Sequence, residues 1–277
     1  NLPQLSINYD IIFNSNKKSP AQIRYQGILY AINNGYKKLL FTDVDDSYSS
    51  NYVYELAKGL DVYDFVYSTI IPVGKNGEKM DNYFSVPQKS EHYENIINFN
   101  YIGLGSSGVL TEKLKNIIIP KDIYAVDWWL YTILLLDGMK GGLVANAINY
   151  YKQHENNLVG GRQKLHIKRL NEGIKIKQMH FNHIYEYCRE NNLILLEDSA
   201  QALGSFYKDG LHQGRKGIAG SFSFSAPKII STGQGGAIIT DDDDLAYNVS
   251  RLKDFGRSSG GNDVHDMIGF NFKFTDI

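Results

Sequence analysis

The sequence predicts an α/β protein built from two consecutive modules. Strand-like and helix-like segments alternate through the first half of the chain, and a second alternation starts near residue 178. The 277 residues are 43% hydrophobic and 21% charged, a composition typical of globular domains and sufficient for one large or two modest ones. We therefore predict a first module at residues 1–178 and a second at residues 179–277.

A well-marked helix begins the alternation in the first module. Ser19 stands at its N-cap, Pro20 at its first position, and Gly35 follows its last apolar residue. The elements predicted after it are a strand at 37–42, a helix at 49–60, a strand at 63–71, a hairpin turn at 74–79, a helix at about 126–136 and a strand at 142–151. Strands that alternate with helices favour a mainly parallel sheet.

The second module follows a polar, mostly helical segment at residues 162–191. Its predicted elements are a helix at 180–191, strands at 193–198, 221–225 and 235–240, and a helix at 244–256. The acidic run at 241–244 directly precedes that last helix, where carboxylates are favoured by the free amide groups, so we predict a capping role for it.

Charge and cysteine content exclude several classes of protein. The formal net charge is -1, with Lys+Arg 29 against Asp+Glu 30, so the chain has no basic excess for nucleic acid or an anionic membrane. Cys188 is the single cysteine, which excludes an internal disulfide and makes the cytoplasm the expected location. The longest apolar run, bounded by Asp127 and Asp137, is too short to span a bilayer.

One lysine of the second module is surrounded by residue types that suit a cofactor. The apolar strand LILLED ends in Asp198, and SFSFSAPK places Ser223 five residues before Lys228. Lysine, a carboxylate and clustered hydroxyls are the groups needed to hold pyridoxal 5'-phosphate covalently, keep its ring nitrogen protonated and bind its phosphate. Spacing alone favours the simpler interpretation that Lys228 is a solvated residue at a strand end.

A family resemblance reverses that preference. EDSAQALGSFYKDG, GIAGSFSFSAPKIISTGQGGAIITDDDDLA, RLKDFG and IGFNFKFTDI together resemble the DegT/StrS family of sugar aminotransferases, in the family's order and spacing. The resemblance implies part of the large domain of the type I aminotransferase fold, with pyridoxal phosphate as cofactor. It also implies roles for five residues: Lys228 binds the cofactor and moves the proton, Asp198 pairs with the ring nitrogen, Gln201 lies at the ring, and Ser223 and Asn271 bind phosphate. In this family the counterpart of Asn271 serves the neighbouring subunit, so a homodimer is expected.

The first module contains an acidic loop after a buried strand. LLFTDVDDSYSS places Asp43, Asp45 and Asp46 at the strand's end, where alternating carboxylates suit a hard divalent cation with room left for diphosphate oxygens. On its own, such a loop is more often a solvated turn or a helix cap.

The surrounding motifs add a second resemblance. RYQGILYAINNGYKKLLFTDVDD, the AVDWW helix start and YYKQHENNLVG are similar to inverting nucleotide-sugar glycosyltransferases of the GT-A type, with a Rossmann-like fold. The resemblance implies that Asp43 and Asp45 hold Mg or Mn and the sugar nucleotide, and that Asp127 deprotonates the acceptor. Arg24 and His154 are weaker candidates for the diphosphate and for the metal or product phosphates.

Three functional hypotheses follow. In the first, the chain joins a glycosyltransferase to an aminotransferase that uses a nucleotide-linked keto-sugar and an amino donor such as glutamate, both for surface polysaccharide. In the second, only the glycosyltransferase works; in the third, the chain is a non-catalytic truncated or joined product. Family elements expected before residue 9 and after residue 277 indicate an internal piece of a longer fusion.

Overall fold

The computed structural model describes residues 19–74, 76–80, 86–97, 99–152, 167–258 and 263–272. The chain divides into two compact units, residues 1–180 and residues 181–277, called here the first and the second unit. Helix α5, Ile167–Glu190, contributes residues to both. In the described ranges, no helix is both long and apolar enough to cross a membrane.

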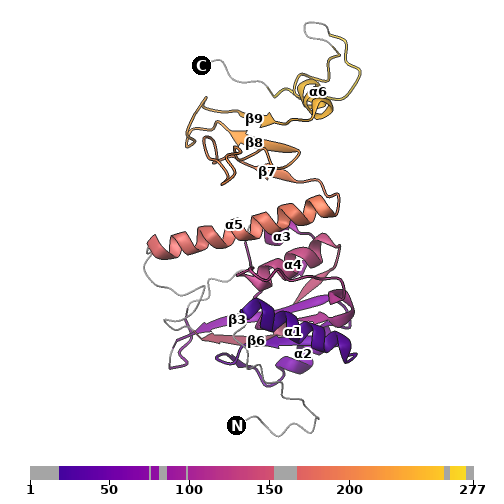
Figure 1. Ribbon diagram of the computed structural model, residues 1–277, viewed down its shortest axis with the longest axis vertical. Helices are drawn as coiled ribbons and strands as arrows, with labels where there is room; N and C mark the ends of the chain where they lie inside the picture. Colours follow the sequence, from indigo (N-terminus) through magenta and orange to yellow (C-terminus); the bar gives the residue numbers. More distant parts are fainter. Residues whose placement is uncertain are drawn as a thin grey trace. The chain divides into compact units, whose positions relative to one another are not determined.

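The first unit is built on a six-stranded mixed sheet (Figure 1). Along the sheet the order is β1-β5-β3-β6-β2, and β4 pairs with β6. The strands are β1 Lys38–Thr42, β2 Ser47–Tyr48, β3 Phe65–Val73, β4 Lys89–Ser90, β5 Ser106–Leu110 and β6 Gly141–Lys152. Among these pairings only β3 with β6 is parallel, so the prediction of a mainly parallel sheet is wrong for this unit.

The position of β5 explains the difference. It inserts between β1 and β3 and runs antiparallel to both, so β1 and β3 point the same way without being hydrogen-bonded neighbours. A helix between two strands sets their relative direction, but it does not prevent a later segment from entering between them. The α/β class is therefore confirmed, whereas the pairing pattern is not.

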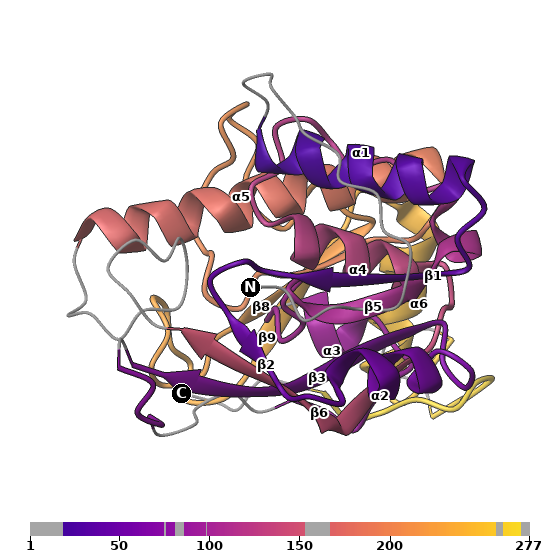
Figure 2. The same cartoon turned by 90° about the horizontal axis from the view of Figure 1, so that it is seen from below.

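Helices cover both faces of this sheet (Figure 2). They are α1 Pro20–Asn33, α2 Tyr52–Gly59, α3 Glu94–Ile97, the 3-10 helix Thr111–Leu114 and α4 Val126–Leu136. Successive residues of β3 face opposite sides: the Phe65 ring lies 5.2 Å from that of Tyr131 on α4, and Val66 packs in a core cluster with Leu56 of α2. The apolar run predicted to be a buried helix is α4, most of whose side chains are buried.

The start of α1 agrees with the sequence prediction. The Ser19 hydroxyl accepts a hydrogen bond from the Gln22 amide at 3.3 Å, and the Gln22 side chain accepts one from the Ser19 amide at 2.9 Å. This reciprocal capping box satisfies two amides that the first turn leaves without helical partners.

The second unit contains a three-stranded sheet and helix α6, Asp243–Leu252. The sheet has the order β7 Leu196–Asp198, β8 Ala219–Ser223, β9 Gly236–Ile239, which lie side by side in Figure 1. The pair β7 and β8 is parallel, and β8 and β9 are antiparallel. The predicted cap is confirmed, because the Asp242 carboxylate accepts from the Leu245 amide at 2.8 Å. Cys188 is buried, like Ile184 one turn before it.

Candidate functional site

The predicted cofactor lysine lines a cavity of about 380 Å³ in the second unit. That volume falls within the range of about 300 to 1,000 Å³ that is usual for small-molecule sites. Its lining combines three predicted cofactor residues with small and aliphatic ones: Ala200, Gln201, Leu203, Ser223, Pro227, Lys228, Ile229 and Ile230. The structure thus brings Lys228, Gln201 and Ser223 to one cavity.

A closed loop after β8 presents the lysine. The Phe224 amide donates to Gly235 O and the Thr232 amide donates to Phe224 O, both at 2.9 Å, so the two ends of the loop are joined. Gly233 and Gly235 have φ values of 74° and 133°, which L side chains rarely adopt. The glycines of the GQGG sequence are therefore needed for the chain to turn back into β9.

Strand register explains how Asp198 relates to this cavity. Asp198 is paired with Ser221 in the parallel ladder, and Ser223 lies two residues further along β8. Because side chains alternate along a strand, these three project from the same face of the sheet. Asp198 also accepts a hydrogen bond from the amide of Ala200, a cavity residue, at 3.1 Å.

These residues fit pyridoxal phosphate in kind. An amine, a hydroxyl and an amide side chain meet at the cavity, and a carboxylate lies on the same sheet face. Asn271 does not line the cavity; it forms an isolated β-bridge with Asp254. Its predicted phosphate contact remains a prediction.

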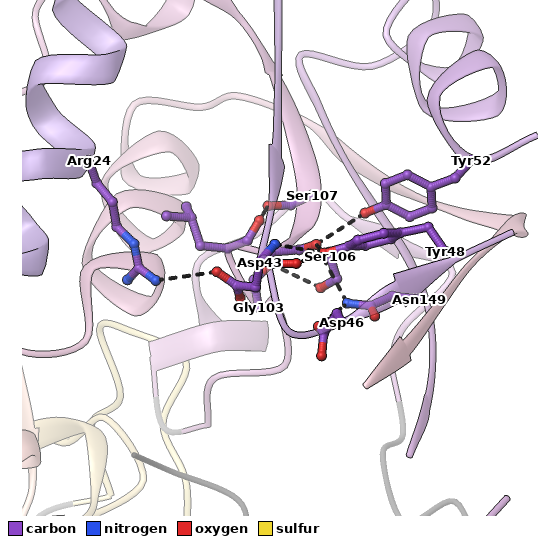
Figure 3. A network of polar contacts seen from close by, with 11 residues as sticks. Arg24, Asp43, Asp46, Tyr48, Tyr52, Gly103, Ser106, Ser107 and Asn149 are labelled. Atoms are coloured by element: carbon purple, nitrogen blue, oxygen red, sulfur yellow. Dashed lines mark hydrogen bonds and ion pairs between the residues drawn. The ribbon is translucent and has the colours of Figure 1, made fainter. Parts of the chain in front are cut away.

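The acidic sequence of the first unit forms a turn (Figure 3). Strand β1 ends at Thr42, and the Asp46 amide donates to Asp43 O at 3.3 Å. The predicted strand at 37–42 thus ends where β1 ends, and the acidic residues follow it in a turn. Asp43 and Asp46 are half-buried, whereas Asp45 is exposed.

Asp46 is held by β6, the strand that pairs with β2 directly after it. Its carboxylate accepts from the Asn149 side-chain amide at 3.1 Å and from the Lys152 main-chain amide at 3.0 Å, both on β6. The Tyr48 hydroxyl accepts from the Asp43 amide at 2.7 Å and donates to Gly105 O at 3.1 Å. Asn149 is 103 residues from Asp46 and Gly105 is 57 residues from Tyr48, so local spacing gave no signal for them.

Arg24 interacts with both Asp43 and Asp127, the residue predicted to be the general base. Its guanidinium nitrogen Nη2 lies 3.8 Å from Asp43 Oδ1, and its charge also acts on Asp127. Burial raises the pKa of Asp127, while the Trp128 amide, which donates to Oδ1 at 2.8 Å, and Arg24 partly offset this rise. Burial likewise raises the pKa of Asp43, against the opposing effect of Arg24. A carboxylate with a raised pKa is a better proton acceptor near neutral pH.

The predicted metal site has no supporting cluster of protein ligands. No group of three or more His, Cys, Asp or Glu side chains suited to a metal ion occurs in the part of the chain that the structure describes. The charges of Asp43 and Asp45 interact, which makes them neighbours, and their role as metal ligands stays a prediction. His154 lies outside the described residues.

Comparison with known proteins finds similarities for the part of the chain that contains the second unit. Residues 177–277 match the model of the DegT/DnrJ/EryC1/StrS aminotransferase family. The relatives found include proteins named as aminotransferases, such as the L-glutamine:2-deoxy-scyllo-inosose aminotransferase of Streptomyces fradiae, 45% identical over 70 residues, 25% of this chain and 16% of that protein. None of these findings bears on the glycosyltransferase resemblance of the first unit.

Particular relatives match over about a third of the chain. The GDP-perosamine synthase of Caulobacter vibrioides is 40% identical over 94 residues, which are 34% of this chain and 25% of that protein. The GDP-perosamine synthase of Escherichia coli O157:H7 is 38% identical over 94 residues, 34% of this chain and 26% of that protein. Among solved structures, Helicobacter pylori PseC, an aminotransferase involved in the biosynthesis of pseudoaminic acid, is 33% identical with a TM-score of 0.30, covering 32% of this chain and 24% of that one. The chain thus spans about a quarter of the length of these relatives.

Because the pKa of Asp127 is raised, we expect the substitution Asp127→Asn to change the stability of the protein in a pH-dependent way. A carboxyl with a raised folded pKa contributes stability that is complete below its unfolded pKa, near 3.8, and is lost as the pH rises through the folded pKa. Asp127→Asn removes this charge but keeps only one acceptor oxygen for the Trp128 and Leu104 amides, so we expect its free energy of unfolding, relative to that of the parent, to increase as the pH rises from 3.8 to neutral.

Urea unfolding across a range of pH checks this expectation. The stability of Asp127→Asn relative to the parent should fall as the pH falls toward 3.8. The exposed Asp122 supplies the control, Asp122→Asn, for which we expect no such trend. A difference in stability between variant and parent that stays constant from pH 3.8 to neutral pH would contradict the burial argument.

Proposed function

We propose that the second unit is the cofactor-binding core of an aminotransferase that depends on pyridoxal phosphate and acts on a nucleotide-linked keto-sugar. The observation that supports this most directly is the shared cavity of Lys228, Ser223 and Gln201, on the sheet face that also presents Asp198. The family match over residues 177–277 supports the same reaction class. Glutamate is a suitable amino donor, and a homodimer is the assembly that the role of Asn271 would require.

Each residue has a defined task in this proposal. Pyridoxal phosphate, when bound, supplies a ring that withdraws electrons from the substrate carbon. Lys228 Nζ bonds the cofactor covalently and moves the proton at that carbon. The Asp198 carboxylate holds a proton on the ring nitrogen, Gln201 contacts the ring, and Ser223 and Asn271 bind the phosphate.

Removing the lysine amine should abolish covalent cofactor binding. Protein purified with pyridoxal phosphate is expected to be yellow, and Lys228→Ala colourless, because no other cavity residue named here can form that bond. Lys208→Ala removes an exposed lysine of the same unit and should stay yellow. Visible absorption spectra check this; equal colour in the parent and Lys228→Ala would exclude the assignment.

A second candidate function is favoured by the acidic site of the first unit. Arg24 pairs with Asp43 on the turn after β1, and its charge also acts on Asp127 at the start of α4. We propose inverting glycosyl transfer from a nucleotide sugar, in which Asp43 and Asp45 bind Mg or Mn, Arg24 approaches the diphosphate and Asp127 deprotonates the acceptor hydroxyl. One chain would then serve two steps in surface-polysaccharide assembly, and the cytoplasm is the location that these substrates favour.

The metal ligands can be tested by binding rather than turnover. Mn or Mg should increase nucleotide-sugar affinity in the parent by about tenfold or more, and Asp45→Ala should lose this increase. Asp61→Ala removes an exposed carboxylate that pairs with Lys38 and should keep it. Calorimetric titration with and without metal gives the comparison; metal-independent binding of equal strength in parent and Asp45→Ala would reject this role.

A further inference from the structure

Glu197 occupies a position unlike that of the exposed carboxylates around it. It is only 7% exposed, although it directly precedes the exposed Asp198 on β7. Because successive side chains of a strand point to opposite faces, Glu197 lies on the face away from Ser221 and Ser223. A buried carboxylate is costly unless hydrogen bonds satisfy it, so its surroundings must supply several donors.

Four donors converge on this carboxylate. Oε1 accepts from the main-chain amides of Lys216 and Gly217, the latter at 2.7 Å, and Oε2 accepts from the Gly214 amide at 2.9 Å and from the Tyr207 hydroxyl. Burial and the bond to Glu197 raise the pKa of Tyr207, which keeps its hydroxyl proton in place. One side chain thus holds the whole segment 214–217 against the sheet.

Segment 214–217 also packs so closely on the sheet that no space is left for a Cβ atom at two glycines. Gly214 has a φ of 95°, and a Cβ on Gly220 of β8 would lie 2.3 Å from Gly214 O. A Cβ on Gly217 would lie 2.3 Å from Leu195 O, just before β7. Main chain therefore packs directly on main chain, and a shift of segment 214–217 must displace β7 or β8.

We infer that Glu197 is a positioning residue for the cofactor site, because it fixes β7 and β8 so that Asp198 and Ser223 keep their places on the opposite face. This inference rests on the proposed aminotransferase function. Glu197 itself touches neither cofactor nor substrate; its effect passes through the strand that it shares with Asp198.

The substitution Glu197→Gln removes the charge and one hydrogen-bond acceptor while the size of the side chain stays nearly the same. Its amide nitrogen must replace either Oε1, which faces two main-chain amides, or Oε2, which faces the Gly214 amide. In both orientations at least one buried main-chain amide loses its acceptor, a loss that corresponds to about a tenfold change in an equilibrium constant. Tyr207→Phe removes one donor and leaves the three main-chain bonds in place.

The test uses the full chain and two readouts. In Glu197→Gln we expect amide hydrogen exchange at 214, 216 and 217 to rise about tenfold without cofactor, and the dissociation constant for pyridoxal phosphate to rise about tenfold. Tyr207→Phe should change both by a smaller factor, and Glu190→Gln, an exposed carboxylate of α5, should change neither. Circular dichroism confirms the fold; if Glu197→Gln does not fold, Tyr207→Phe decides the question by the same two readouts.

Different results distinguish the possible failures. Faster exchange together with unchanged cofactor affinity would overturn the positioning role, and unchanged exchange would overturn the hydrogen-bonded clamp itself. A parent protein that does not bind pyridoxal phosphate at all would instead show that the proposed function is wrong, and the inference would fall with it.

Discussion

The second unit depends on the alternation of two neighbouring acidic residues on a very short strand. Glu197 turns inward and satisfies donors from four residues, whereas Asp198 turns outward to the face of the cavity. We infer that Glu197 fixes β7 in place and that Asp198 depends on this for its position. A one-residue change of register would exchange them, placing an unsatisfied carboxylate inside and removing the acid from the cofactor face.

Both units place their chemical groups where strands end. In the first unit, the acidic turn follows β1 and is tied to β6 through Asp46. In the second, Asp198 ends β7 and the loop of Lys228 follows β8. The carboxyl ends of strands in α/β sheets open toward solvent while the sheet keeps them rigid, and ligands commonly bind there. In the functions proposed above, this arrangement would serve both the lysine of the second unit and the carboxylates of the first.

The carboxylates of the acidic site and Glu197 of the second unit differ in what stabilises them. Around Asp43 and Asp127, desolvation works against the charged forms, and Arg24 offsets only part of this effect. Around Glu197, main-chain amides satisfy the buried carboxylate, so its charge helps to hold the segment 214–217 in place. A site that is electrostatically unfavourable when empty is suited to bind a cation or take up a proton, whereas a satisfied one is suited to a structural task.

The sequence predicted those helices, strands and caps well that depend on residues close together in the chain. The capping box at Ser19, helix α4, the cap at Asp242 and the strands on either side of Lys228 depend on neighbouring residues and were foreseen. The insertion of β5, the contact of Asp46 with Asn149, and the reach of Glu197 to Gly214 depend on distant segments. Periodicity and motif spacing contain no information about such contacts. The strand before the acidic turn was foreseen with its end at Thr42, whereas the contacts that hold the turn to β6 were not.

The central claim is that Lys228 is the residue to which the cofactor bonds. Loading the full chain with pyridoxal phosphate, reducing the bond with borohydride and mapping the peptides by mass spectrometry would locate the attachment directly. The account predicts a stable pyridoxyl label on the peptide that contains Lys228. A label on another lysine, or no label on a folded and loaded protein, would contradict it.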